Sequence, residues 1–584
     1  MKLILFPALI LFGTLIFGEE DTRADGHSIH GEVFNVGPRQ AAVLIDGTGD
    51  VNFPVSTRSK EAQAFFNEGI GQLHGYWDFE AERSFRQASA IDPDCAMAYW
   101  GIAMANYKNA DRGKGFIGEA LKRIDGTNEK EKLWINSLAA WFDKSTGKDK
   151  ERREAIADSI RKIVSKYPDD VEAKAFLYRW TYQNSRKGVP IPDFDAMTAI
   201  SDQIFAKAPS HPTHHYVIHL WDRKKPANAL ESAALCGPSA PAIAHMWHMP
   251  GHIYSKLRRY REAAWYQEAS ARVDHAHMMK FHLLPDQIHN FAHNNEWLVR
   301  NLIYIGRGRD AVSLARNMIE LPRLPKFSKE GDDKSYDPNK SSWKHGRKHL
   351  KDTLFQFEQW NELLALQDTP WLEPDGKTIS RSELDKYIAI ASFETGDIEA
   401  GRKILAKVKS DSNTHRELSI YDALNATPPD TEKAASLLPR LRSVPKIRHA
   451  WLWHRAGDNE KAVAMARDAV KTTPGQVIPL AIQVQILYSA GKLDEAEKSF
   501  KKLRTTACVA DTDLPVFRPL AEIAAQLGFP EKWQTPASPK NDPGPHPDLE
   551  SLGPFRWSPP IAPGFALHDF NGKEYRLTNR KGKA

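Results

Sequence analysis

A spacing of 34 residues recurs along this 584-residue chain and restricts its fold more than any other feature. Ala229 recurs as Ala263, and Gly457 recurs as Gly491 near the end of the chain. A repeat of this length accommodates two helices and the turn that joins them. Because such a hairpin buries its apolar face only by stacking on its neighbours, the spacing predicts an all-α array of stacked helical hairpins.

The residue types inside the repeats support this prediction. A helical hairpin needs small residues where its first helix crosses its second, and we assign Gly69, Gly101 and Gly251 to such positions. A proline follows the second helix of two repeats, at Pro93 and Pro474. This combination is typical of the tetratricopeptide repeat, so we expect a tetratricopeptide-type α-solenoid in two blocks.

Changes in composition divide the chain into seven segments. Helical periodicity dominates from about residue 60 to about residue 533, with one polar, charged interruption that contains Pro338. A proline-rich stretch follows the last helices. The predicted segments are a signal peptide (1–23), a short irregular or β arm (24–56), a first repeat block with a histidine-rich groove (57–325), an insertion loop (326–345), a second repeat block (346–534), a linker (535–560) and a C-terminal segment (561–584).

The N-terminal residues have the pattern of a secretory signal. Lys2 is followed by an apolar run from Leu3 to Phe17 and then by polar residues. Since this run is slightly short for a membrane-spanning helix, we expect a signal peptide and an exported protein, periplasmic or extracellular. An uncleaved signal that anchors the chain is the alternative, and no other transmembrane domain is expected.

Charge and cysteine content exclude several classes of protein. The net charge is only +6, and basic residues are interspersed with acidic ones, which argues against nucleic-acid binding. Cys95, Cys236 and Cys508 lie far apart and form no C-x-x-C or zinc-finger spacing. We therefore expect buried structural thiols and no disulfide framework.

Histidine is concentrated in the first repeat block, where twelve of the 22 histidines lie between residues 211 and 293. The repeat spacing relates His211 to His245 and His214 to His248, so we expect these four imidazoles on one surface of adjacent hairpins. Three pairs lie four residues apart, the spacing that chelates a metal ion on one helical face: His215/His219, His248/His252 and His289/His293. The candidate ligands are His211, His214, His215, His219, His245, His248, His252, His275, His277, His289 and His293.

These histidines are candidates for a transition-metal site, with zinc or copper as the metal, because neutral imidazole binds both. A hydrogen-bonded structural network, a polar groove for a peptide, a pH-responsive surface and a catalytic histidine are the alternatives. Pro250 affects the prediction, since a helix that begins there leaves His245 and His248 in the preceding turn. No H-E-x-x-H motif occurs in the sequence, so a zinc hydrolase of that type is not predicted.

The C-terminal residues 562–584 contain an A-P-x-F-x-L segment and then D-x-x-G-K. This pattern resembles the start of a redoxin domain of the AhpC/TSA-like, thioredoxin-fold type. The repeat region, with HPTHHYVIHLWD and IAHMWHMPGHIYSKL, is similar to exported bacterial tetratricopeptide proteins fused to such a domain. The resemblance implies a secreted scaffold with a thiol–disulfide or peroxide-reducing module, which is truncated here because no redox cysteine follows the motif.

Three functions are consistent with these features. The first is an exported scaffold that binds a protein, a peptide or another ligand in its concave groove, with a histidine-rich metal site. The second is the targeting or substrate-binding part of a thiol–disulfide or peroxide oxidoreductase whose catalytic redoxin domain is missing from this chain. The third is a metal-dependent enzyme that uses the histidines. The sequence contains no complete catalytic constellation, so the catalytic residues stay unassigned, and no organic cofactor site is predicted.

Overall fold

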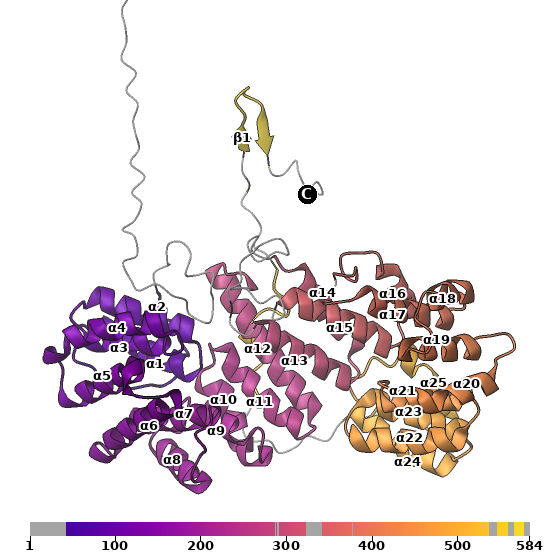
Figure 1. Ribbon diagram of the computed structural model, residues 1–584, viewed down its shortest axis with the longest axis horizontal. Helices are drawn as coiled ribbons and strands as arrows, with labels where there is room; N and C mark the ends of the chain where they lie inside the picture. Colours follow the sequence, from indigo (N-terminus) through magenta and orange to yellow (C-terminus); the bar gives the residue numbers. More distant parts are fainter. Residues whose placement is uncertain are drawn as a thin grey trace, which may run out of the picture. The chain divides into compact units, whose positions relative to one another are not determined.

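Helical hairpins of the tetratricopeptide type make up nearly all of the described structure, as the repeat spacing predicts (Figure 1). The computed structural model describes residues 42–285, 288, 291–322, 341–375, 378–536, 546–558, 564 and 566–576. The predicted signal peptide, most of the arm and most of the insertion loop lie outside these residues. Among the described helices, none has both the length and the apolar character needed to span a bilayer.

The chain forms two compact units, of which the first comprises residues 42–44, 51–73 and 78–194 of the described part. Its helices are α1 (Lys60–His74), α2 (Asp78–Ile91), α3 (Ala96–Ala105), α4 (Ala110–Lys122), η2 (Ile124–Gly126), α5 (Glu129–Phe142), η3 (Lys144–Thr146), α6 (Asp149–Lys166) and α7 (Val171–Ser185). The described end of the predicted arm, residues 42–56, contains no strand, and its Phe53 is buried in this unit against Phe66.

The second unit comprises residues 45–50, 74–77 and the described residues from 195 onward. Its first helices are α8 (Phe194–Lys207), α9 (His214–Trp221), η4 (Pro226–Ala229), α10 (Leu230–Ser239), α11 (Ala244–Lys256), α12 (Tyr260–Phe281), α13 (Phe291–Tyr304) and α14 (Gly308–Glu320). The following helices are α15 (Ser342–Gln356), α16 (Trp360–Leu366), α17 (Arg381–Glu394), α18 (Ile398–Leu405), α19 (Asn413–Leu424), α20 (Thr431–Leu437), η8 (Leu438–Arg440), α21 (Lys446–Arg455), α22 (Asn459–Thr472), α23 (Val477–Ser489), α24 (Leu493–Thr506), η9 (Pro515–Phe517), α25 (Pro519–Gln526) and α26 (Leu549–Leu552).

In the first unit, Phe85 of α2 explains why glycine occupies the predicted crossing positions. A Cβ atom on Gly69 would lie 2.6 Å from the Phe85 ring, and one on Gly101 would lie 2.4 Å from it. Both distances are shorter than any ordinary carbon–carbon contact. The two glycines therefore let α1 and α3 approach α2. Gly69 lies where the first helix of its hairpin crosses the second, as predicted, whereas Gly101 faces the second helix of the preceding hairpin.

We expect Gly101→Ala to lower the free energy of unfolding by about 1–3 kcal/mol, because the added methyl group overpacks against Phe85. The matched control is Gly118→Ala on α4 in the same unit, where an added Cβ meets no atom within 4 Å. Alanine has the higher helix propensity, so this control should gain about 0.5–1 kcal/mol. Urea denaturation followed by circular dichroism measures both changes. Effects of the same sign and size would contradict the close approach.

In the second unit, the first helices of successive hairpins pack against one another as well as against their own second helices. Contacts of this kind join α9 to α11, α11 to α13, α13 to α15, α17 to α19 and α21 to α23. In tetratricopeptide-type folds the first helices line one surface. We call the surface formed by α9, α11, α13 and α15 the inner surface of this unit.

The boundary between the units differs from the predicted division at residues 326–345. Helices α14 and α15 flank that loop and pack against each other, and one hydrophobic core extends from Ala264 to Trp533. Gly346 permits this packing, since a Cβ there would lie 2.7 Å from the carbonyl oxygen of Ala315. The loop interrupts the periodicity of the sequence without interrupting the core, and α15 already begins at Ser342.

Residues 546–558, which we predicted as part of a linker, instead pack against α12 of the second unit. Arg272 donates a hydrogen bond to the carbonyl oxygen of Gly553 (3.0 Å), and the ring of His546 stacks on Trp265 with centroids 3.9 Å apart. Trp557 is buried as well. The proline content that suggested a linker removes helical periodicity, but these specific contacts hold the segment in place.

The D-x-x-G-K segment forms a β-hairpin. Strand β1 (Ala566–His568) pairs antiparallel with β2 (Glu574–Arg576), and Leu567 lies opposite Tyr575. The Asp569 carboxylate accepts hydrogen bonds from the backbone N–H groups of Asn571 (2.9 Å) and Lys573 (3.0 Å). Gly572 supplies the left-handed conformation of the turn, with φ of 77°. The D-x-x-G-K residues thus form the turn between the two strands.

Candidate metal-binding site

Ligand side chains from the first helices of successive hairpins gather in three groups in the second unit, and within each group the ligand atoms lie within 4.8 Å of one another. The first histidine triad consists of His215 and His219 on α9 and His245 on α11. The second histidine triad consists of His248 and His252 on α11 and His293 on α13. The third group, here called the glutamate–histidine group, consists of Glu296 on α13 and His345 and His349 on α15.

Each pair of histidines four residues apart in the triads lies on a single helix, as chelation by such a pair requires. Pro250 lies inside α11 and does not begin it, so the concern that His248 would fall in a preceding turn does not apply. His248 and His252 therefore occupy successive turns of one helix and one face of it. His215 and His219 have the same relation on α9.

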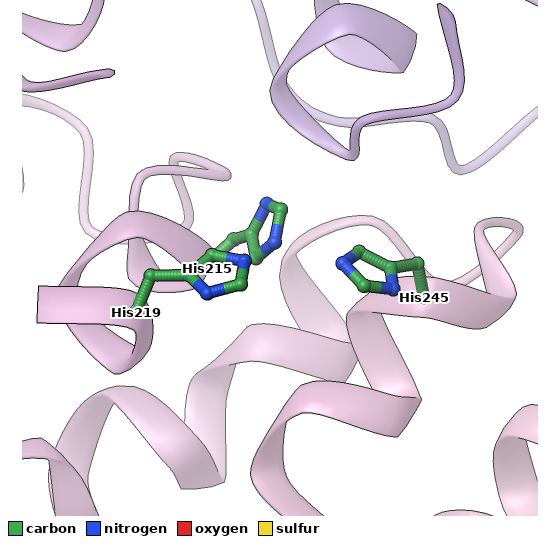
Figure 2. A group of neighbouring side chains, drawn as sticks. All are labelled: His215, His219 and His245. Carbon is green, nitrogen blue, oxygen red and sulfur yellow. The ribbon is translucent and has the colours of Figure 1, made fainter. Parts of the chain in front are cut away.

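In the first histidine triad, the imidazoles from α9 and α11 face one another (Figure 2). The ring centroid of His215 lies 4.7 Å from that of His219 and 4.8 Å from that of His245. Nδ1 of His215 lies 2.6 Å from the carbonyl oxygen of His74. A carbonyl only accepts, so Nδ1 carries the proton of the neutral ring, which places the lone pair on Nε2.

Tyr76 covers the first histidine triad. Its ring centroid lies 4.5 Å from that of His215 and 5.4 Å from that of His219. Tyr76 has a φ of 55°, in the left-handed region that residues with side chains seldom adopt. Strained backbone of this kind persists where the surroundings hold it, often at functional sites. Tyr76 was not among the predicted site residues, because it lies far from these histidines along the chain.

In the second histidine triad, Gln267 of α12 fixes the orientation of His248. The Gln267 amide donates to the backbone carbonyl of His248 (3.2 Å), and its Oε1 lies 2.6 Å from Nδ1 of the same residue. Nδ1 therefore holds the proton, and the lone pair lies on Nε2. That Nε2 is 2.8 Å from Nε2 of His252, so a proton on the His252 ring lies between the two nitrogens.

Burial keeps His248 of the second histidine triad neutral. It lowers the pKa of His248 well below the usual value, and the nearby His252 adds to the effect. It also lowers the pKa of His293 to about 4, again with a contribution from His252. Metal ions bind the deprotonated ring nitrogen, so both residues are in the ligand form at neutral pH.

The predicted gathering of His211 and His214 with His245 and His248 is wrong for the first two residues. His214 stacks on Phe205 with centroids 3.9 Å apart, and its Nε2 lies 2.8 Å from the carbonyl oxygen of Pro209. His211 precedes α9 and its Nδ1 lies 2.8 Å from the hydroxyl of Thr213. Because α9 begins only at His214, the side chains that reach the inner surface are His215 and His219.

The remaining predicted ligands lie elsewhere. Nδ1 of His275 is 3.1 Å from the carbonyl oxygen of Pro554, so this residue helps to hold the C-terminal segment. His277 packs edge-on against Trp77, with centroids 4.7 Å apart. His289 lies outside the described residues.

The glutamate–histidine group was not among the predicted ligands, although the sequence contains a signal for it. His345 and His349 are four residues apart, like the pairs that were identified. They lie beyond the histidine-rich segment, and His345 lies within the predicted insertion loop. For these two reasons they were not predicted as ligands. Glu296 follows His293 by three residues, which puts both on one face of α13.

Two of the three cysteines agree with the prediction of buried structural thiols, whereas Cys508 is half-buried. Cys95 and Cys236 are buried. Burial raises the pKa of the Cys95 thiol to about 11 and raises that of Cys236 well above its usual value. Such thiols are poor nucleophiles at neutral pH, because the thiolate is the reactive form.

A cavity of about 680 Å³ lies farther along the second unit. Its lining combines apolar side chains with six charged ones from α15, the turn after it, α17, α19 and α21. The charged side chains are Asp352, Glu358, Lys386, Glu417, Lys446 and Arg448. This mixture of apolar wall and paired charge is typical of a ligand pocket.

Comparisons with known proteins establish no family. No protein-family model matches the chain, and neither does any curated protein. Similar solved structures include the human IFIT1 dimer with PPP-AAAA (9% identity, TM-score 0.26, 76% of this chain and 90% of that chain). They also include the APC/C hetero-tetramer Cut9–Hcn1 (12% identity, TM-score 0.25, 79% of this chain and 76% of that chain). A third is the TPR domain of P58(IPK) (11% identity, TM-score 0.22, 80% of this chain and 98% of that chain). Similarity at this level says nothing about ligands or partners.

Proposed function

We propose that this protein is an exported tetratricopeptide-type scaffold that binds transition-metal ions, zinc or copper, through the histidine triads on the inner surface. The observation that carries the proposal is the second histidine triad. It brings three imidazoles from two helices within reach of one ion, and burial keeps His248 neutral. Export is supported by the signal-like N-terminal sequence.

The geometry of the second histidine triad fits a bound ion after a small adjustment. Zinc–nitrogen bonds are about 2.0–2.1 Å long, so nitrogens around a tetrahedral ion lie roughly 3.4 Å apart. The Nε2 atoms of His248 and His252 are 2.8 Å apart and share a proton. An ion that displaced this proton would increase the distance between the two nitrogens by about 0.6 Å, a shift that side-chain rotation can provide.

The surroundings of the second histidine triad resemble the outer shell of metal sites. Nδ1 of His252 lies 3.7 Å from the carboxylate of Asp222. When Nε2 of His252 loses its proton to an ion, Nδ1 becomes the protonated nitrogen and can donate to this carboxylate. The Trp297 ring stacks on the imidazole of His252, with centroids 4.1 Å apart, and limits the rotation of this imidazole.

We expect Gln267→Leu to weaken zinc binding at the second histidine triad about 10- to 100-fold, because Gln267 sets the proton position and orientation of His248. The matched control is Ser232→Ala, which removes an equivalent contact to His214 (3.1 Å) outside the triads. Competition with a chromophoric chelator measures both affinities. Equal affinities for the two variants would contradict the role of Gln267.

The proposal itself is tested with metal-free protein titrated with zinc and, separately, with copper. We expect one tightly held equivalent for each histidine triad, measured by calorimetry and by elemental analysis after gel filtration. Bound metal should also raise the melting temperature, since an ion at 100 times its Kd stabilises the folded state by about 2.7 kcal/mol. Protein that retains neither metal and melts at an unchanged temperature would contradict the proposal.

A further inference from the structure

The glutamate–histidine group extends the row of imidazoles to α15. His345 and His349 lie one turn apart on this helix, which begins after the N-cap Ser341, whose side chain accepts a hydrogen bond from the N–H of Lys344. Helix α13 packs against α15 and supplies Glu296 between the two rings. Two helices thus present two nitrogens and a carboxylate to one point.

The distances in this group match ligands around an ion better than hydrogen bonds. Nδ1 of His345 lies 3.5 Å from Oε2 of Glu296, and Nε2 of His349 lies 3.7 Å from Oε1. A charge-assisted hydrogen bond would be about 2.7–2.9 Å long. Two atoms that each lie about 2.1 Å from a tetrahedral ion are separated by roughly 3.4 Å. The observed gaps leave room for a cation.

Burial of His349 supplies a second observation. The residue is only 8% exposed, and among the described residues its Nε2 receives and donates no hydrogen bond. Buried polar atoms nearly always have a partner, because losing hydration without one costs about 1–3 kcal/mol. The same nitrogen is directed toward Glu296, so a bound ion would satisfy it.

The charge of the group also suits a cation. Glu296 supplies a carboxylate oxygen, which is an anionic ligand at neutral pH. An anionic oxygen with two imidazoles is a common ligand set for divalent zinc, manganese and iron. The other two triads provide nitrogen ligands alone.

We propose that Glu296, His345 and His349 form a third metal site, which binds a divalent transition-metal ion through one oxygen and two nitrogens. This inference rests on the proposed function and adds a site of different chemistry to it. Glu296 also connects the site to the second histidine triad, since its Oε2 lies 3.9 Å from Nδ1 of His293. The three sites would then form one row across α9, α11, α13 and α15.

The test counts zinc equivalents in the full chain after gel filtration. We expect the double variant His345→Ala/His349→Ala to lose one equivalent relative to the unmodified protein. Glu296→Gln, which keeps the size of the side chain and removes its charge, should weaken one equivalent at least about 10-fold in a chelator competition. Lys348→Ala is the matched control, because Lys348 is exposed on the same helix, and it should leave number and affinity unchanged.

The outcomes separate this inference from the proposed function. If the double variant binds as many equivalents as the unmodified protein, the third site is wrong while the triads stand. If the unmodified protein binds no zinc, both proposals fail together. If the double variant does not fold, Glu296→Gln decides: weakening of one equivalent supports the site, and unchanged affinity of all equivalents overturns it. Cobalt absorption spectra add a readout, since loss of the carboxylate should alter one component only.

Discussion

Replacing His248 and His252 together with alanine should remove one zinc equivalent and weaken binding at the second histidine triad by at least about 1000-fold, or about 4 kcal/mol. Both rings come from one face of α11, so the variant leaves His293 as the single imidazole of the triad. One imidazole alone cannot hold zinc against water and buffer, because structural and catalytic zinc sites use three or four protein ligands. Elemental analysis and calorimetry measure the change.

The control for this variant is His214→Ala. This residue is buried and belongs to the same unit, and the repeat spacing relates it to His248. Its Nε2 lies 2.8 Å from the carbonyl oxygen of Pro209, away from the triads, so the control should keep its zinc even if its stability falls. A control that lost zinc while the first variant kept it would show that the repeat spacing, and not the structure, had identified the ligands.

Arg347→Ala should lower the free energy of unfolding by about 3–5 kcal/mol, because it leaves a buried carboxylate without its cation. Arg347 is fully buried on α15, and its Nη1 lies 2.9 Å from Oδ2 of Asp375. Its Nε also donates to the carbonyl oxygen of Trp371 (3.1 Å), and its Nη2 donates to that of Glu373. The side chain thus holds the segment that follows α16 against α15.

Chemical denaturation of the full chain measures this loss, with Arg467→Ala as the control. Arg467 pairs with Glu495 at the surface, where both side chains are about half exposed. Water and salt screen such pairs, so the control should change stability by less than about 1 kcal/mol. A loss of the same small size for Arg347→Ala would contradict the structural role of this residue.

Part of the candidate site was accessible to sequence reasoning. Two histidines four residues apart on a helix face the same way whatever surrounds them, so the pairs His215/His219 and His248/His252 were identified correctly as neighbours. Their assembly with His245 and His293 depends on how α9, α11 and α13 pack. Gln267 and Tyr76 could not be found at all, because neither has a local pattern that relates it to histidine.

The errors have a common physical origin. The repeat spacing assumes that every hairpin begins its first helix at the same phase, and α9 departs from this by starting at His214. His211 therefore falls in the preceding turn. In the same way, the polar segment before Ser342 suggested a boundary between blocks, although Gly346 allows α15 to pack closely on α14.

Features that depend on residues close together in sequence are determined by the sequence itself. They are the helical periodicity, the glycines that face Phe85, the histidine pairs four residues apart and the D-x-x-G-K hairpin. Long-range association is different, because it depends on helix phase and on the packing of side chains that lie tens of residues apart. Only the folded structure brought Glu296 between His345 and His349, and placed Gln267 on His248. A repeat sequence determines its own hairpins, whereas the stacking of those hairpins decides which polar groups meet.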